Sequence, residues 1–574
     1  MSSPASRAVA SQPRNEPHYA VVIVGAGPTG LTLANLLGAY GVRTLLVERG
    51  SDVVDEPRAV SIDDESLRTL QAAGVVESVL EQVVRGYGTW YYSWRGKEFA
   101  RVEPNASEYG FPKRNAFRQQ ILVAQLRDNL KRFEHVSLKF DHESVSFTDY
   151  GDGVRLQLLH AGEIKPVRCD WLVACDGGRS GIREQLGIVL AGRTYGKRWL
   201  IVDLIGRTSP FRHTKTFCDP ARPAIRLPGP TGTLRYEFML HDHESAEDVL
   251  DEPLIRQWIR ARDPRDAPLP IARKVVYTFH ARVAEQWKRG RVFLAGDAAH
   301  LTPPFAGQGM NSGVRDAANL SWKLAAVVHG RLGEPLLDSY EEERRPHAWA
   351  LIRMAMRIGR FMQPTSVASA ILMQATLKLV STYRPVRDYI LHLRFKPKPR
   401  FGSGFFSAGH ARRASVPAGQ LLPQPWVELY RGERVRLDDV LGTGFAMLML
   451  PGAGSTEFGR IFERAGVPYR RVRIIPRIDD FIEEPEAGCT EAVIRDDAGV
   501  LEDIMRSVGA DVMFVRPDRY VLGYARADDP DSIAALGQLF GRFVYATRPA
   551  MSAASPEASG AVAPADEEMA DKID

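Results

Sequence analysis

The sequence predicts an α/β protein that begins with a Rossmann-like dinucleotide-binding domain. Three observations support this fold class. A glycine-rich turn, Gly25–Gly30, lies between a strand-like and a helical segment, and segments of these two kinds alternate after it. The loop Gly296–Asn311 again follows a short strand and opens a helix, and the intervening segment 199–287 changes to a pattern typical of an antiparallel sheet.

The first turn has the G-x-G-x-x-G pattern of a dinucleotide site. Gly25 makes the tight turn, Gly27 allows close approach of a pyrophosphate, and Gly30 packs the helix on the strand. A second predicted strand ends at Glu48, at the spacing of the acid that binds a ribose hydroxyl. Glu48 would repel a 2′-phosphate, so the sequence favours the adenosine half of FAD or NAD over that of NADP. The alternative is a glycine-rich turn in an ordinary α/β domain.

The loop Gly296–Asn311 predicts a second anion-binding site. A strand at 291–295 precedes it and a helix at 312–329 follows it. The first N–H groups of a helix have no partner inside the helix and lie at the positive end of its dipole. Such a helix start suits a phosphate or a partly anionic ring.

Composition limits the possible functions. The chain has 574 residues, a net charge of +5 and 44% apolar residues, as expected of a folded protein of two to four domains without a nucleic-acid or membrane partner. Its 4 cysteines are scattered, which argues against a disulfide framework or zinc site and favours a reducing cytoplasm. We find no signal peptide and no apolar stretch long enough to cross a membrane.

The predicted sheet at 199–287 is an insert of the kind that covers the reactive end of a cofactor. Arg226 and Arg235 are candidate ligands for a substrate carboxylate, although arginines are common on surfaces. His280 is a candidate base, with a packed or hydrogen-bonded histidine as the alternative. The loop His241–Glu244 resembles a metal site but lacks a third clustered ligand, so we favour a solvated turn and expect no metal.

The rest of the chain divides by composition. We expect a nucleotide-binding domain at 19–395, the inserted sheet at about 199–287, a helical extension at about 335–393, a connector at 396–425, a small α/β unit at 426–549, and disordered ends at 1–18 and 550–574.

Three segments in this order carry a family resemblance. They are Gly25–Gly30, Cys175–Gly178 and Gly296–His300, and they resemble the three flavin motifs of single-component FAD-dependent aromatic-ring hydroxylases of the p-hydroxybenzoate hydroxylase type. The likeness runs from about Tyr19 to Pro549 and includes Arg114–Phe117. It implies that the 19–395 domain binds FAD and that the 426–549 unit is thioredoxin-like. That unit has no cysteine pair, which favours a structural or oligomer-contact role.

The resemblance also implies roles for individual residues. The cofactor-binding residues, those of the nucleotide motif included, are Gly25, Gly27, Gly30, Glu48, Arg49, Arg58, Gln119, Asp176, Gly296, Asp297, Gly307, Gly309, Met310 and Asn311. Arg58 and Gln119 would contact the ribityl and phosphate region, although Arg58 by itself also fits a solvated loop charge. The backbone amides of Gly309, Met310 and Asn311 would meet the O2 edge of the flavin, and the carbonyl of Pro304 would face the substrate hydroxyl.

The implied activity is ortho-hydroxylation of a phenolic acid. NADH or NADPH would reduce the FAD, and O₂ would then form a flavin hydroperoxide that attacks the ring. The likeness is closest to family members that act on 3-(3-hydroxyphenyl)propionate and 3-hydroxycinnamate, giving a 2,3-dihydroxy catechol. One alternative is a related monooxygenase that acts on another phenol or a polyketide. The other is a non-catalytic flavin-binding scaffold. A homo-oligomer is possible in each case.

Overall fold

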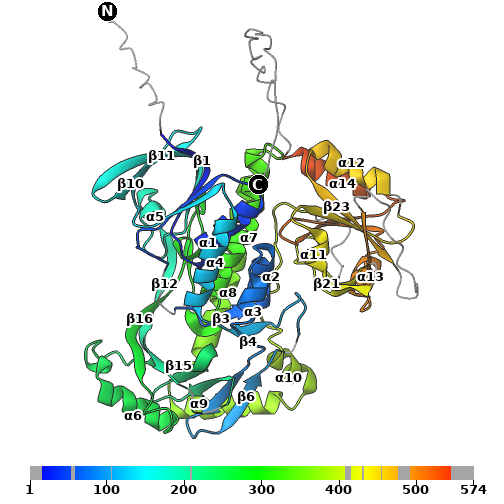
Figure 1. Cartoon of the computed structure of the whole chain (residues 1–574). Coiled ribbons are helices and arrows are strands. Elements are labelled where there is room, and N and C mark those ends of the chain that lie inside the picture. Colours follow the sequence, from blue (N-terminus) through cyan, green and yellow to red (C-terminus); the bar gives the residue numbers. More distant parts are fainter. Residues whose placement is uncertain are drawn as a thin grey trace, which may run out of the picture.

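The computed structural model describes residues 16–53, 58–104, 106–206, 208, 210–407, 415–429, 432–453, 455–475 and 491–543. A Rossmann-like domain and an inserted sheet lie at opposite ends of two long central helices, and a second α/β unit packs at their side (Figure 1). Of the disordered ends predicted at 1–18 and 550–574, residues 1–15 and 550–574 lie outside the described residues, whereas 16–18 are described and β1 begins at His18. Within them, no helix combines the length and apolar character needed to cross a bilayer.

The Rossmann-like sheet brings four motif loops to one edge. Its strand order is β17-β18-β11-β1-β2-β8, and β18, β11, β1, β2 and β8 run parallel. The carboxyl ends of parallel strands meet at the same edge of a sheet, where ligands bind. The strands are β1 (His18–Val24), β2 (Thr44–Val47), β8 (Val136–Lys139), β11 (Glu163–Ala174), β17 (Lys288–Arg289) and β18 (Val292–Leu294), with β9 (Glu143–Asp149) and β10 (Val154–His160) beside β11.

Helices cover this sheet because its strands are apolar on both faces. Val21, Val22 and Ile23 of β1 are fully buried, as expected for a central parallel strand. The predicted strand–helix–strand unit is confirmed, and α1 packs against α4 and α7. The helices of this domain are α1 (Pro28–Ala39), α2 (Asp64–Ala72), α3 (Val76–Leu80), α4 (Gln119–Asn129), α5 (Gly181–Gln185) and α7 (Gly309–Val328), and α8 (Ser339–Met362) packs on α7. Two further helices, α9 (Val367–Val380) and α10 (Arg384–Leu391), contact β6 (Glu98–Val102) of the inserted sheet.

The inserted sheet is larger than the predicted segment 199–287. Its order is β19-β16-β12-β15-β14-β13-β5-β6, so two strands from the earlier part of the chain complete it. The strands are β5 (Thr89–Ser93), β6 (Glu98–Val102), β12 (Leu190–Ile205), β13 (Thr214–Cys218), β14 (Ala224–Pro228), β15 (Thr233–Met239), β16 (Ile271–Ala284) and β19 (His300–Leu301), with α6 (Glu252–Arg262) packed nearby. A small sheet, β3 (Ser61–Asp63), β7 (Arg114–Ala116) and β4 (Val84–Arg85), links the two large ones.

The C-terminal unit is a mixed sheet that docks through buried charges. Its order is β21-β20-β24-β23-β22-β25-β26. Arg516 binds Glu343 of α8 at 2.7 Å, and Lys323 of α7 binds the same carboxylate at 2.8 Å. The elements are β20 (Trp426–Glu428), β21 (Arg434–Arg436), β22 (Phe445–Met449), β23 (Tyr469–Ile475), β24 (Glu491–Arg495), β25 (Val512–Val515), β26 (Val521–Ala525), α11 (Leu437–Leu441), α12 (Ser455–Ala465), α13 (Val500–Arg506) and α14 (Pro530–Gly541).

No cysteine pair exists in this C-terminal unit, because Cys489 is its only cysteine in the sequence and lies outside the described residues. The described cysteines, Cys169, Cys175 and Cys218, are unpaired. The C-terminal unit therefore contributes packing and buried ion pairs rather than dithiol chemistry.

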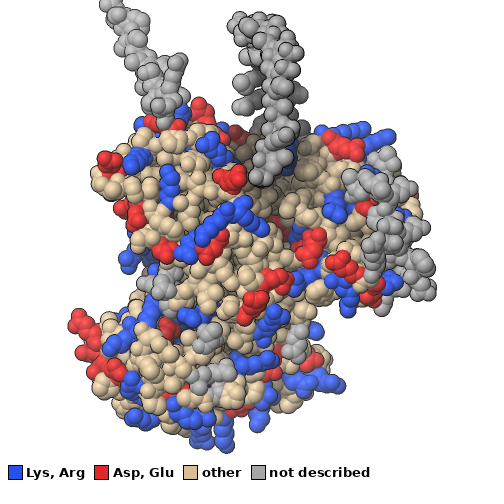
Figure 2. All heavy atoms as spheres, in the orientation of Figure 1, with Lys and Arg blue, Asp and Glu red and all other residues tan. Residues whose placement is uncertain are grey.

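On the face drawn in Figure 2, acidic and basic side chains are mixed, and basic ones gather at the lower end, over the inserted sheet and its helices.

Candidate active site

One cavity of about 620 Å³ runs from the loop edge of the Rossmann-like sheet to the inserted sheet. Most of the residues predicted from the sequence line it. They are Gly25, Gly27, Glu48, Arg49, Arg58, Gln119, Asp176, Asp297, Pro304, Gly307, Gly309 and Met310. Gly30, Gly296, Asn311, Arg226, Arg235 and His280 are not among its lining residues. The structure therefore brings the separate nucleotide motifs and Pro304 together, and it leaves Arg226, Arg235 and His280 out of the cavity lining.

The glycine-rich turn is shaped to hold a ligand. Gly25 has φ +105°, and a Cβ atom there would clash with the carbonyl oxygen of Cys175. Gly30 packs directly on the backbone of Gly25. A Cβ atom at Gly27 would instead have no protein atom within 4 Å, because this residue faces the cavity. The helix α1 starts beside it without a side-chain cap, so its N–H groups are directed at this space.

Glu48 closes the nucleotide end of the cavity. Its Oε2 accepts a hydrogen bond from the backbone N–H of Ala26 at 2.8 Å, and its Oε1 accepts one from Gly50 at 3.0 Å. These two bonds fix the carboxylate beside the glycine turn, where the spacing of the sequence predicts it. The position suits a ribose, because a carboxylate accepts hydrogen bonds from hydroxyl groups.

Two more carboxylates line the middle of the cavity. Asp176 follows β11, and its Oδ2 accepts a hydrogen bond from the N–H of Ile182 at 3.3 Å. Its Oδ1 is buried and has no hydrogen-bond partner among the described residues. Burial raises the pKa of Asp176 and also that of Asp297, which follows β18. Both groups are thus suited to bind hydroxyl or amide groups of a polar ligand.

The start of α7 also opens on the cavity. Gly309 and Met310 line it, and Gln308, the N-terminal residue before the helix, makes no capping hydrogen bond through its side chain. The side chain of Asn311 is fully used in the protein. It accepts from the N–H of Asp63 at 3.1 Å and from Ser66 at 2.7 Å, and it donates to the carbonyl of Ser61 at 3.0 Å. Asn311 therefore positions the helix start, and only its backbone amide is left to meet a ligand.

A buried ion cluster holds the Gly296 loop against α7. Asp316 accepts hydrogen bonds from the N–H of Gly296 at 3.1 Å, from His300 at 2.7 Å and from Arg344 at 2.9 Å. Burial opposes its charge, but His300 and Arg344 outweigh this effect and lower the pKa of Asp316 to about 2. The histidine of this motif is thus a structural contact, and Gly296 contributes through its backbone.

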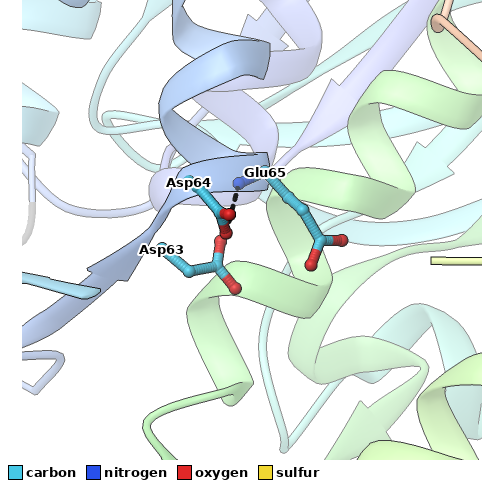
Figure 3. A group of neighbouring side chains, drawn as sticks. All are labelled: Asp63, Asp64 and Glu65. Atoms are coloured by element: carbon cyan, nitrogen blue, oxygen red, sulfur yellow. Dashed lines mark hydrogen bonds between the residues drawn. The ribbon is translucent and has the colours of Figure 1, made fainter. Parts of the chain in front are cut away.

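Three acids lie together at the start of α2, where Figure 3 shows the side chains of Asp63, Asp64 and Glu65. Arg315 binds both Asp63 and Glu65, and Lys396 binds the same two carboxylates at 3.0 and 2.7 Å. Burial raises the pKa of Asp64 to about 7, although Lys396 opposes this effect. Because two cations already neutralise the cluster, we interpret it as a structural network and do not assign it a metal.

The predicted ligands Arg226 and Arg235 are used elsewhere. Arg226 donates to Asp266 at 2.6 Å, and it lies on the face of the sheet opposite to the cavity because side chains alternate along a strand. Arg235 lies on the cavity side, but it binds Asp203 at 2.6 Å and donates to the carbonyl of Arg58 at 3.1 Å. Arg226 is therefore not placed to bind a ligand in the cavity, and Arg235 supports the loop that carries Arg58.

His280 also lies away from the cavity. It is half-buried on β16, and its Nδ1 lies 3.2 Å from the hydroxyl of Thr194 on β12. Burial lowers its pKa, and Arg282 adds to this effect. These contacts agree with the alternative of a hydrogen-bonded structural histidine.

The inserted sheet contributes residues to the cavity that the sequence did not single out. In one row across four strands, Tyr91 pairs with Thr216, Thr216 with Ile225, and Ile225 with Glu237. In the next row, Thr89 pairs with Thr214. All of these side chains line the cavity. In the sequence, the alternation Thr214-x-Thr216 and Ile225-x-Leu227 indicates that these side chains lie on one face of their strands. Only the pairing of β5 with β13 in the structure shows that Thr89 and Tyr91 extend the same face.

Glu237 is the one acid of this part of the sheet that lines the cavity. Burial raises its pKa to about 7, while Arg235 on the same strand opposes the shift. A carboxyl group with a pKa near neutrality can be present in either protonation state under ordinary conditions. The end of the cavity beside the inserted sheet therefore holds a titratable group that sequence patterns do not reveal.

A Rossmann-like loop edge that shares one cavity with a mostly antiparallel sheet is the arrangement expected of a dinucleotide-dependent oxidoreductase. FAD fits the residues present. The open side of Gly27, the fixed carboxylate of Glu48, the unpartnered Oδ1 of Asp176 and the uncapped start of α7 all face a continuous space of the kind that a long, anionic dinucleotide requires.

Comparison with known proteins defines the family. Residues 18–355 match the family model described as FAD binding domain, and residues 419–539 match the HcaD C-terminal domain. A 3-(3-hydroxy-phenyl)propionate/3-hydroxycinnamic acid hydroxylase of Mycobacterium sp. (strain KMS) is 40% identical, with 88% of each chain covered. The enzyme of the same name from Klebsiella pneumoniae (strain 342) is 38% identical over 90% of this chain and 93% of the relative. The chain belongs to the FAD-dependent aromatic-ring hydroxylase family.

Solved structures agree with the fold. The flavin-dependent monooxygenase PieE in complex with FAD and substrate is 23% identical, with a TM-score of 0.75 over 92% of this chain and 99% of that one. Aklavinone-11 hydroxylase with FAD and aklavinone is 25% identical, with a TM-score of 0.72 over 92% and 100% of the two chains. Together with the hydroxylases that are 38–40% identical, the family model shows that the protein is an FAD-dependent aromatic monooxygenase, and no relative named here supports a non-catalytic scaffold.

Proposed function

We propose that the protein hydroxylates 3-(3-hydroxyphenyl)propionate, and 3-hydroxycinnamate, at the ring position ortho to the phenol, with NADH or NADPH as the electron donor. The observation that carries this proposal is the single cavity that joins the nucleotide loops to the inserted sheet. The relatives that share most of the chain at 36–40% identity carry the name of this activity. The product would be a 2,3-dihydroxy catechol.

We assign the cofactor to the nucleotide end of the cavity. Gly25, Gly27 and the start of α1 would hold the pyrophosphate, Glu48 the ribose, and Asp297 the ribityl chain. When bound, FAD supplies the electrons that activate O₂. The N–H groups at the start of α7 are fixed by Asn311 before any ligand arrives, so they would stabilise negative charge beside Gly309 and Met310 without reorganisation.

We assign the aromatic substrate to the end of the cavity that the inserted sheet forms. Its apolar walls are Ile225, Leu227, Phe305, Ile358 and Met362. They would bury the ring and keep water from the reacting atoms. The carbonyl of Pro304, next to Phe305, would accept a hydrogen bond from the phenol. Glu237, with a pKa near 7, is available to exchange a proton with it.

A screen of phenolic acids tests this function. Oxygen uptake and NADH or NADPH loss are followed together, and the product is identified by chromatography and NMR. We expect coupled consumption with 3-(3-hydroxyphenyl)propionate and the 2,3-dihydroxy product. Oxygen uptake without a hydroxylated product would argue against this substrate, and coupled turnover of a larger phenol alone would favour the polyketide alternative. Cytoplasmic location, a homo-oligomer and the residue roles given above stay predictions.

A further inference from the structure

A polar group of residues lies at one side of the substrate end of the cavity. Arg114 comes from β7, Thr89 from β5 and Thr214 from β13, while Tyr87 precedes β5. All four line the cavity. We call them the Arg114 group. Three segments of the chain thus contribute one cation and three hydroxyl groups to the same wall.

Arg114 has no carboxylate partner in the part of the chain that the structure describes. Its Nη1 donates to the hydroxyl of Thr89, and its guanidinium carbon lies 4.4 Å from the centre of the Tyr87 ring. The other cations along this wall differ. Lys396 binds two carboxylates at 2.7 and 3.0 Å, and Lys113 lies 3.8 Å from Glu108. Arg114 therefore keeps its charge available for an anion from outside the protein.

Two hydroxyl groups beside Arg114 are buried without a partner. The Oη of Tyr87 and the Oγ1 of Thr214 have no hydrogen-bond partner among the described residues, and the two residues are only 1% and 2% exposed. Burying a polar group without a partner is unfavourable, so native proteins rarely leave such groups unused. A cation and two unused donors on one wall form a receptor for a group with two acceptor oxygens.

The anion that this receptor binds is not the pyrophosphate, because the Gly27 turn and the start of α1 provide for that group at the other end of the cavity. The neighbouring wall is apolar, since Ile225 and Leu227 face the same space. Asp63 lies opposite Arg114 in the β3–β7 pair, but Arg315 and Lys396 bind its carboxylate. Glu237 lies two strands from Thr214, or about 10 Å across the strands. An occupant of this end therefore combines an apolar body with an acidic group.

We propose that Arg114, with the hydroxyls of Tyr87 and Thr214, binds the carboxylate of the aromatic substrate and selects acids over uncharged phenols. The proposal rests on the proposed function and deepens it by naming the residues that recognise the acid. It replaces Arg226 and Arg235, which bind Asp266 and Asp203. A guanidinium pairs well with a carboxylate because both are planar and can form two parallel hydrogen bonds.

The test compares an acid with its amide. Dissociation constants of 3-(3-hydroxyphenyl)propionate and 3-(3-hydroxyphenyl)propionamide are measured by calorimetry on the FAD-loaded protein, for the wild type and for Arg114→Met. Arg114→Met should weaken binding of the acid about 10- to 100-fold and leave the amide within about threefold, because only the acid loses an ion pair with the guanidinium. Arg114→Lys should recover part of the loss.

Two further variants keep the test decisive. Thr214→Val preserves shape and should weaken acid binding about three- to tenfold, which tests the receptor even if Arg114→Met does not fold. Arg101→Met removes an exposed arginine on β6 that pairs with Glu98, and it should bind both ligands like the wild type. FAD content and circular dichroism check folding.

Failure of this inference is distinct from failure of the proposed function. Equal losses for acid and amide in Arg114→Met, or no loss for the acid in Thr214→Val, would overturn the assignment of the Arg114 group. Turnover is measured in parallel, and a wild type that binds the acid but forms no catechol would count against the proposed function and leave the carboxylate receptor standing.

Discussion

The two ends of the cavity are built in different ways. At the nucleotide end, loops that follow parallel strands present glycines, helix starts and short fixed carboxylates, so backbone geometry does most of the binding. At the substrate end, rows of side chains from neighbouring strands face the cavity, and their identity comes from strand register. The difference implies that the nucleotide end tolerates few substitutions, whereas single substitutions at the substrate end can change the substrate specificity.

Breaking the support of the nucleotide end should have the largest effect. Asp316→Asn leaves Arg344 without its buried carboxylate and weakens the contacts to Gly296 and His300. We expect a loss of about 3–5 kcal/mol in the free energy of unfolding, as for other broken buried ion pairs. Urea denaturation measures it.

An exposed aspartate–histidine pair provides the control. Asp170 lies 3.0 Å from His18, with side chains 40% and 54% exposed. Asp170→Asn should change stability by less than about 1 kcal/mol, as expected for surface pairs. Similar losses for Asp316→Asn and Asp170→Asn would contradict the structural role given to the buried cluster.

A second prediction concerns the substrate end and pH. Burial raises the pKa of Glu237 from 4.5 to about 7, so between these values the folded state binds more protons and stability falls as pH rises. Glu237→Gln removes this dependence. As the pH rises from 4.5 to 8, the free energy of unfolding of the variant should therefore increase by on the order of 3 kcal/mol relative to that of the wild type. Denaturation at several pH values tests this, and a constant difference between the two proteins would refute it.

The third prediction separates binding from folding at the nucleotide end. Gly27 has ordinary extended backbone angles and faces open space, so a valine fits the fold but occupies the place of the ligand. Gly27→Val should weaken FAD binding about 100-fold, or about 2.7 kcal/mol. The unfolding midpoint of the FAD-free protein should stay close to that of the wild type. Retention of FAD at wild-type affinity would show that Gly27 does not face the cofactor.

The smallest effect is expected at His280. This histidine contacts Thr194 between two strands and does not line the cavity. His280→Ala should change kcat/KM less than about twofold, far below the 10²- to 10⁴-fold contribution of a general base. Steady-state kinetics over a pH range measures it, and a lost ionisation in the pH profile would restore His280 as a base.

The two ends also differ in how far the sequence could predict them. Gly25, Gly27 and Glu48 follow each other at fixed spacing around one strand–helix–strand unit, so a local pattern identifies them. Thr214 and Glu237 share one sheet only through the pairing of β13, β14 and β15, and Arg114 of β7 meets that sheet through its hydrogen bond to Thr89 of β5. Arg226 and Glu237 look equally suitable in sequence, and only the register shows that Arg226 faces Asp266 on the other side.

The family resemblance predicted cofactor loops that line the cavity, whereas Arg226 and Arg235, chosen from the sequence as substrate ligands, do not line it. Asp176, Asp297 and Met310 lie in or beside its motifs, and they line the cavity. The contact between Asp316 and His300 cannot be read from the sequence, because the two residues are 16 positions apart and only the packing of the loop on α7 brings them together. Side chains that hold the loops of the site in place without lining the cavity are therefore identified only in the structure.

We infer that one cavity brings FAD, O₂ and a phenolic acid together. Turnover of 3-(3-hydroxyphenyl)propionate under isotope-labelled O₂, with the product analysed by mass spectrometry and NMR, tests this inference. We expect a 2,3-dihydroxy product that carries one labelled oxygen atom in the new hydroxyl group. An unlabelled product, or oxygen consumption with the substrate recovered unchanged, would contradict it.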